Sequence, residues 1–397
     1  MDPRTNPYAP GAGTQPPELS GRDEIIEKAA IAVDRCRADL PARGLLMVGL
    51  RGVGKTVLLT HISQDAEAKG YAVVSIEMPE KRSLPALLIP ALRSALLKID
   101  RMAASGALIK KTLRVLGSFV EAMKLKYADV EFSVNLEKQL GIADSGDLEH
   151  DLMELFIEVG EAVKEKKTAL ILFIDEIQYI KEDQFAALIM ALHKCAQKRL
   201  PVLLIGAGLP QLIAQAGRAK SYAERLFEYP EIGPLSQAAA EKALAIPAER
   251  LKMHYTKEAL SEILRQTQTY PYFLQEWGKH AWDAAKSSSI TLEDVKFATE
   301  LAISELDASF FRVRFDRLTP AEKKYLRAMA ELETSACRSG DIAHILQREV
   351  QSVAPIRATL VAKGMIYSLS HGDNAFTVPL FGAYMKRVMP HFAPLNE

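Results

Sequence analysis

A run of eight residues offers the clearest chemistry in the chain. It comprises Gly49, Leu50, Arg51, Gly52, Val53, Gly54, Lys55 and Thr56, and matches every fixed position of the pattern G-x-x-x-x-G-K-[ST]. Glycines let such a loop curl with its backbone N–H groups pointing inward, where a Cβ would intrude on a bound phosphate. The run therefore predicts a phosphate-binding loop. The alternative is a glycine-rich turn that binds nothing.

The segments on either side of the loop have the composition that this chemistry requires. Residues 44–48 are an apolar run of strand length, and a helical pattern begins at Val57. The partial positive charge of a helix N-terminus would add to the loop's N–H donors. We expect the loop through Val57 to hold ATP, with Lys55 at the β- and γ-phosphates and the Thr56 hydroxyl on Mg²⁺.

Two carboxylates follow a second apolar run. Residues 169–174 read as a central parallel strand that is covered on both faces, and Asp175 and Glu176 come directly after it. Ligands of open α/β sheets bind at the carboxyl ends of the strands. We expect Asp175 to order a water on Mg²⁺ and Glu176 to polarise the attacking water. The alternative for Asp175 is a helix N-cap.

Composition indicates a soluble globular protein with two or three domains. The 397 residues are 48% hydrophobic and 25% charged, and the formal net charge is zero, so no global basic field indicates a nucleic-acid partner. The three cysteines, Cys36, Cys195 and Cys337, have no metal-ligand spacing. We find no signal-peptide pattern and no apolar run of membrane-spanning length. These features predict a cytoplasmic protein without membrane contact.

The pattern along the chain divides it into four segments. Residues 1–18 form a Pro/Gly-rich arm, 19–235 an α/β ATPase domain with a helical insert at about 83–167, 236–308 a helical lid and 309–397 a winged helix. Within the insert, residues 130–136 alternate like a half-buried strand. The lid segment reads as all helical, with breaks at Pro247, at Tyr270-Pro271 and at Ser287-Ser288-Ser289. The arm is either a disordered tail or an extended segment across the nucleotide pocket.

The last segment has the pattern of a winged helix-turn-helix. Helices are predicted from Thr319-Pro320, from Ser339 and from Gln351 to Lys363, and two short strands flank the turn at residues 371–374. From Phe311 to Glu397 there are 12 Lys and Arg against 8 Asp and Glu, an excess of 4. Arg357 and Lys363 could reach duplex DNA from the third helix. The alternative is a regulatory module that contacts a protein.

With loop, acids and winged helix in one chain, the sequence resembles AAA+ ATPases of the origin-recognition-like group and the neighbouring STAND and archaeal-type ATPases. The resemblance runs over nearly the whole chain from Ser20. It implies an α/β P-loop NTPase fold with a parallel sheet, a helical lid and a C-terminal winged helix. It also implies that Gly21 and Arg22 lie near adenine, and that the protein is an ATPase that acts as a nucleotide-driven switch.

The sequence departs from these families at several positions. Gly206-Ala207-Gly208 stands where AAA+ proteins carry a polar sensor residue, and Tyr272 follows Pro271 where the lid arginine is usual. These departures predict slow or partner-stimulated hydrolysis. An arginine finger acting on a neighbouring copy could be Arg225 or Arg218; the alternative for each is a solvated surface arginine. The arginine that STAND relatives carry after the fourth strand is missing, which favours the origin-recognition-like group.

Two functional interpretations therefore remain at this point. One is a DNA-associated ATPase whose winged helix contacts duplex DNA. The other is a STAND-like signalling ATPase, in which the nucleotide state controls assembly into a homo-oligomer or with a protein partner.

Overall fold

The computed structural model describes residues 1–397 apart from 12, 102–106, 131–136, 333–335, 369–371 and 393–397. Residues 131–136 of the predicted strand and the predicted break at Ser105-Gly106 lie outside the described residues, as does His371 of the predicted turn. The chain divides into two compact units. One contains residues 22–49 and 54–232, and the other contains residues 1–21, 50–53 and 233–397.

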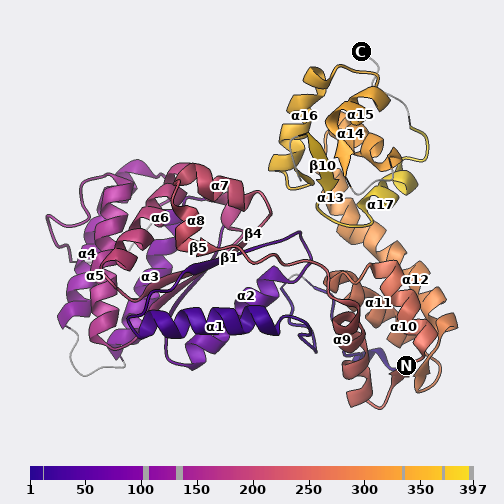
Figure 1. The fold of residues 1–397 in the computed structure, drawn as a ribbon, viewed down its shortest axis with the longest axis horizontal. Coiled ribbons are helices and arrows are strands. Elements are labelled where there is room, and N and C mark those ends of the chain that lie inside the picture. The colour runs from indigo at the N-terminus through magenta and orange to yellow at the C-terminus, as the bar shows by residue number, and fades with distance from the viewer. Residues whose placement is uncertain (12, 102–106, 131–136, 333–335, 369–371, 393–397) are drawn as a thin grey trace. The chain divides into compact units, whose positions relative to one another are not determined.

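The unit formed by residues 22–49 and 54–232 is built on a five-stranded sheet in the order β2-β3-β4-β1-β5 (Figure 1). Its strands are β1 Gly44–Val48, β2 Ala72–Glu77, β3 Leu170–Asp175, β4 Val202–Gly208 and β5 Phe227–Glu228. Its helices are α1 Asp23–Arg37, α2 Lys55–Ala68, α3 Leu84–Arg101, α4 Ala107–Lys126, α5 Leu148–Glu165, the 3-10 turn η2 Ile177–Tyr179, α6 Glu182–Gln197, α7 Leu212–Ala219 and α8 Ala223–Leu226.

Every pairing in this sheet is parallel, and helices cover both faces. Alternate residues of a strand point to opposite faces, so Leu170, Leu172 and Ile174 of β3 join the core with α3, α4, α5 and α6. The intervening Ile171 and Phe173 are also buried. Figure 1 shows α1 and α2 along the other side of the sheet. The predicted α/β parallel sheet is confirmed; in the insert, α3 and α5 pack against strands of the sheet and α4 packs against α3 and α5.

The other unit is largely helical. Its helices are the 3-10 turn η1 Pro3–Thr5, α9 Gln237–Arg250, α10 Lys257–Thr267, α11 Pro271–Ala284, α12 Leu292–Leu306, the π-helical turn η3 Asp307–Phe311, α13 Arg312–Asp316, α14 Pro320–Glu331, α15 Ser339–Ile345, α16 Val350–Ala362 and α17 Phe381–Val388. Its strands are β6 His254–Tyr255, β7 Ser289–Ile290, β8 Cys337–Arg338, β9 Ile366–Ser368 and β10 Asp373–Phe376.

Two predictions for residues 236–306 are wrong in part. The short strands β6 and β7 pair in parallel, so the segment is not all helical. Helix α9 also continues through Pro247, although an internal proline removes a hydrogen bond and costs about 3 kcal/mol. Pro247 is buried beside Ala243 and Leu244 on the packed face of α9, and this burial offsets the cost. The predicted breaks before Pro271 and at residues 287–289 are confirmed.

The N-terminal arm packs on the helices of its own unit and is not a disordered tail. Tyr8 is buried, its hydroxyl donates to the Leu244 carbonyl, and its ring lies against Gly278. The amide of Asn6 donates to the Lys279 carbonyl and to Asp283, both at 2.9 Å. These contacts fix the arm on α9 and α11.

The C-terminal elements appear in the predicted order. Helix α14 begins at the Thr319 cap with Pro320 in its first turn, and α15 and α16 follow. Strands β8, β10 and β9 form an antiparallel sheet, and Asp373 and Asn374, which were predicted as turn residues, begin β10 instead. The assignment of this segment as a winged helix, and the boundaries predicted at 235 and 308, stay predictions.

Candidate nucleotide site

The predicted phosphate loop joins β1 to α2 with the backbone conformation that its glycines allow. Gly52 and Gly54 have φ of 85° and 91°, a region that side-chain-bearing residues rarely adopt. Gly54 is the N-cap of α2, so Lys55 is the first residue of the helix and only 6% of it is exposed. A Cβ placed on Gly54 would meet nothing within 4 Å, which leaves the space beside it open.

Thr56 and Asp175 meet at the carboxyl end of the sheet. The Thr56 hydroxyl donates to the Asp175 Oδ2 at 2.6 Å. Burial raises the pKa of Asp175, while the hydrogen bonds from Thr56 and from the Glu176 N–H and the charge of Lys55 act in the opposite direction. A hydroxyl and a carboxylate are hard oxygen donors, which Mg²⁺ prefers. Thr56 and Asp175, the residues predicted for the Mg²⁺ site, therefore carry donor atoms of the kind that this ion prefers.

Glu176 adopts a conformation that is uncommon for a residue with a side chain. Its φ of 49° and ψ of 37° are left-handed, and its N–H donates to Asp175 Oδ1 at 2.8 Å. Such strained conformations persist where the surroundings enforce them, and they cluster at functional sites. The turn directs the Glu176 side chain to Gln178, whose amide donates to Glu176 Oε2.

Gln178 is a site residue that the sequence pattern did not reveal. Its amide nitrogen binds Glu176, and its Oε1 accepts the N–H of Leu209 at 3.1 Å, directly after β4. A Cβ on Gly208 would lie 2.7 Å from the same oxygen, so the glycine makes room for this contact. The family pattern places a polar residue on the strand itself. In the sequence, this contact is indicated by a glutamine two residues after Glu176 and by the glycine that ends β4.

Part of the loop also contacts tyrosines of the helical segment within its own compact unit. The Tyr270 hydroxyl donates to the Arg51 carbonyl, and the Tyr272 N–H donates to the Gly52 carbonyl at 3.2 Å. A Cβ on Gly52 would lie 3.0 Å from the Tyr270 ring. Tyr272 therefore contacts the loop through its backbone, at the position where the families that the sequence resembles carry an arginine.

The other arginines predicted for the site lie elsewhere. Arg22 is at the N-cap of α1, without a side-chain cap bond, and its predicted place near adenine stays a prediction. Arg218 pairs with Glu182 at 3.3 Å. Arg225 lines a groove of about 1210 Å³ together with Arg43 and Leu45. Arg43 and Leu45 lie at the start of β1, whereas the phosphate loop follows its end, so Arg225 lies away from the phosphate loop of its own chain.

The basic side chains predicted to contact DNA are engaged inside the C-terminal segment. Arg357 donates to Asn374 Oδ1 and, at 2.9 Å, to Ser368 Oγ. Lys363 donates to Glu322 Oε2 at 2.7 Å and to the Arg317 carbonyl at 3.1 Å. These interactions tie α16 to the sheet and to α14, so the two side chains contribute to the folding of this segment.

A comparison with protein-family models assigns the segment that contains the phosphate loop and both acids to a known domain. Residues 18–205 match the model of the AAA ATPase domain, and residues 308–385 match a domain of unknown function. The comparison with curated proteins gives no match. Across the described residues, no helix combines the length and apolar character needed to cross a membrane.

Three solved structures are similar to this chain over most of their length. The Walker-type ATPase PABY2304 of Pyrococcus abyssi is 15% identical, with a TM-score of 0.60 over 94% of this chain and 97% of that one. Cdc6p from Pyrobaculum aerophilum is 14% identical over 98% of both chains, with a TM-score of 0.46. The Aeropyrum pernix ORC1 protein, solved in complex with DNA, is 13% identical over 93% of both chains, with a TM-score of 0.45. The first of these supports the fold.

Proposed function

Since residues 18–205 match the model of the AAA ATPase domain, we propose that this chain binds ATP, hydrolyses it slowly and uses the nucleotide state as a switch. The observation that carries the proposal is the 2.6 Å hydrogen bond between Thr56 and Asp175, with Glu176 next in the chain. This hydrogen bond joins the end of the phosphate loop to the first of the two predicted acids.

Each side chain has a defined task in this proposal. The loop N–H groups and Lys55 bind the phosphates, and Thr56 and Asp175 hold the metal and its water. Bound Mg²⁺ would neutralise charge on the β- and γ-phosphate oxygens. Glu176 orients a water and accepts its proton as that oxygen bonds to the γ-phosphorus and the bond to the β-phosphate oxygen breaks. Gln178 positions Glu176.

The tyrosine contacts suggest how the switch is transmitted. Because Tyr270 and Tyr272 bond to the carbonyls of Arg51 and Gly52, a change in the loop on phosphate binding alters hydrogen bonds at the start of α11. The loop would thus have two arrangements, each stabilised by a different partner, which is what a two-state element needs.

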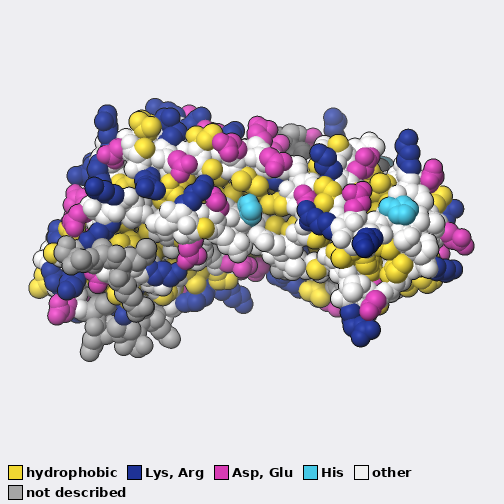
Figure 2. Space-filling model, turned by 90° about the horizontal axis from the view of Figure 1, so that it is seen from below, with side chains coloured by type: hydrophobic (Ala, Val, Ile, Leu, Met, Phe, Trp, Pro, Cys, Tyr) yellow, Lys and Arg dark blue, Asp and Glu magenta, His cyan; other side chains and the backbone are white. Residues whose placement is uncertain are grey.

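Of the two partner classes, the observations favour a protein. Arg357 and Lys363 form intramolecular contacts, and the face drawn in Figure 2 shows basic and acidic side chains interspersed. Strong DNA binding relies on several Lys or Arg contacts with phosphates and weakens steeply with salt. A signalling switch that assembles with copies of itself or another protein needs no such surface.

The experiment that separates the two classes is ATP turnover by the full chain with and without duplex DNA, with Glu176→Gln as the blank. We expect slow turnover that DNA does not change, and nucleotide-dependent assembly in sedimentation velocity. Salt-dependent stimulation by DNA would contradict the protein-partner assignment and leave the ATPase assignment intact.

A further inference from the structure

Two groups of side chains with metal-ligating atoms occur among the described residues, both away from the phosphate loop. One is His150, Asp151 and Glu154, and the other is Glu276, His280 and Glu305; within each group the ligand atoms lie within 4.8 Å of one another. The two groups differ in whether their polar atoms already have hydrogen-bond partners, and this difference decides which one can hold an ion.

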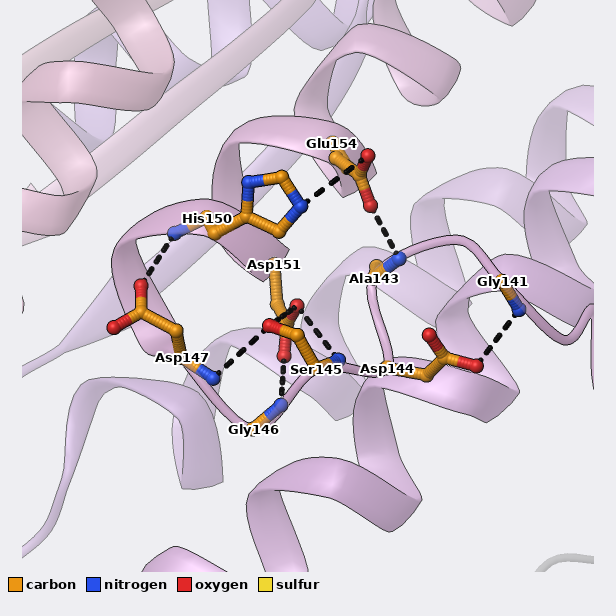
Figure 3. A network of polar contacts seen from close by, with 9 residues as sticks. All are labelled: Gly141, Ala143, Asp144, Ser145, Gly146, Asp147, His150, Asp151 and Glu154. Carbon is orange, nitrogen blue, oxygen red and sulfur yellow. Dashed lines mark hydrogen bonds and ion pairs between the residues drawn. The ribbon is translucent and has the colours of Figure 1, made fainter.

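The first group serves the loop that precedes α5 (Figure 3). Asp151 Oδ1 accepts the N–H of Ser145 at 3.0 Å and its hydroxyl at 2.7 Å, and Oδ2 accepts the N–H of Gly146 at 2.8 Å. Glu154 accepts the N–H of Ala143 at 2.6 Å. These carboxylates satisfy loop N–H groups, which a metal would have to displace. The group is structural.

The second group joins α11 to α12. Glu276 and His280 are four residues apart, so they share one face of α11, and Glu305 reaches them from α12. His280 Nε2 lies 3.5 Å from Glu276 Oε1 and 3.0 Å from Glu305 Oε2. Glu276 is 3% exposed and His280 is 8% exposed, while the Glu305 side chain is 47% exposed. One edge of the group is therefore open to water.

Each buried member of this group has one polar atom without a hydrogen bond of good geometry. Within the described part of the chain, neither Glu276 Oε1 nor His280 Nε2 has a hydrogen-bond partner, although the two atoms face each other. Lys279 donates to both oxygens of Glu305, at 3.0 and 3.1 Å, and so offsets the charge of only one of the two carboxylates. A buried carboxylate oxygen that accepts no hydrogen bond costs free energy unless a cation compensates its charge.

We propose that Glu276, His280 and Glu305 bind a transition-metal dication of the zinc class. An imidazole nitrogen with two carboxylate oxygens suits Zn²⁺, whereas Mg²⁺ and Ca²⁺ favour sets made only of oxygen. Ligands about 2.0–2.1 Å from a tetrahedral ion are roughly 3.3 Å apart. The observed separations of 3.0 and 3.5 Å bracket that value, and water can supply the fourth ligand at the exposed edge.

Binding at this site would connect two helices of the segment that contacts the phosphate loop. Glu276 follows Tyr272 by one helical turn, and the Tyr272 N–H donates to the Gly52 carbonyl. The ion would fix α11 against α12. The inference does not rest on ATP hydrolysis, because metal uptake is measured without nucleotide.

The test is competition between the full-length protein and a chromophoric zinc chelator, after metal removal and with Mg²⁺ in excess. We expect one high-affinity Zn²⁺ per chain. Affinity should fall at least about 10-fold in His280→Gln, since loss of a residue that only hydrogen-bonds to a metal ligand already costs about 10- to 100-fold. Co²⁺ in place of Zn²⁺ should give visible absorption that His280→Gln abolishes.

Two further variants make the result decisive. Glu305→Gln changes the half-exposed ligand, so it tests the site even where a buried substitution prevents folding; it should lose affinity as His280→Gln does. His150→Gln alters the exposed histidine of the other group and should bind like the unmodified protein. If no Zn²⁺ is taken up, or if Glu305→Gln and His280→Gln bind it as tightly as His150→Gln, the assignment is wrong.

Discussion

Thr56 and Asp175 lie 119 positions apart, and the hydroxyl of the first donates a 2.6 Å hydrogen bond to the carboxylate of the second. The two residues follow strands that are not neighbours. Thr56 comes after β1 and Asp175 ends β3, and β4 lies between these two strands. Both strands are parallel to β4, so their carboxyl ends meet at one edge. Two oxygen donors of the proposed metal site are thus already adjacent.

This adjacency predicts a specific magnesium defect. Thr56→Ala removes one oxygen donor and should weaken Mg²⁺-dependent ATP binding about 10-fold, the effect of roughly 1.4 kcal/mol. Thr56→Ser keeps the hydroxyl and should retain most of the affinity. The measurement is calorimetric titration of ATP at several Mg²⁺ concentrations. A Thr56→Ala protein with unchanged Mg²⁺ dependence would exclude Thr56 from the metal site.

Gln178 should affect the chemical step more than binding. Gln178→Ala removes the hydrogen bonds to Glu176 and to the Leu209 N–H, so kcat should fall about 3- to 10-fold while KM for ATP changes little. Gln178→Glu places a second carboxylate beside Glu176 and should lower kcat further. Steady-state ATPase kinetics check this. A change in KM alone would argue against a positioning role.

The sequence predicts the loop, both acids and the parallel sheet because each rests on local pattern. Residues 170–175 form a strand buried on both faces, as their continuous apolar run indicates. The helix break predicted at Pro247 is wrong because the packing of α9 outweighs the free-energy cost of a proline inside a helix. Gln178 and the Tyr270 contact were missed because both depend on residues brought together from distant segments.

The ion pair between Glu322 and Lys363 predicts a pH-dependent stability. Burial would raise the pKa of Glu322, but the hydrogen bonds from Lys363 and Thr319 outweigh it and hold the pKa below its usual 4.5. A depressed folded-state pKa stabilises the fold above the unfolded value, and this contribution is lost as pH falls through the folded value. Glu322→Gln should therefore lower the free energy of unfolding by about 1–3 kcal/mol at pH 7.

Denaturant unfolding at several pH values measures this difference. It should shrink on acidification below pH 4.5 and vanish below the folded pKa. Glu349→Gln changes an exposed acid at the start of α16, where no side-chain cap bond forms, and should leave stability unchanged at both ends of the pH range. A Glu322→Gln effect that persists in acid would assign the contribution to packing instead.

The arm should contribute measurably to the stability of its unit. Tyr8→Ala removes a buried aromatic ring that packs on Gly278 and a hydroxyl that donates to the Leu244 carbonyl, so unfolding free energy should fall by about 3 kcal/mol. Limited proteolysis should then cut the arm faster. Arg4→Ala, on the exposed side of the arm, is the control. Equal protease resistance in all three proteins would mean that the arm is not bound in solution.

The most direct test of the central claim measures ATP binding and ATP turnover on the same samples of the unmodified protein, Lys55→Ala and Glu176→Gln. Lys55→Ala should lose about 10- to 100-fold in affinity, the range expected for a charge-assisted contact. Glu176→Gln should bind ATP normally but turn over on the order of 100-fold more slowly. Unchanged affinity in Lys55→Ala, or normal turnover in Glu176→Gln, would contradict the account.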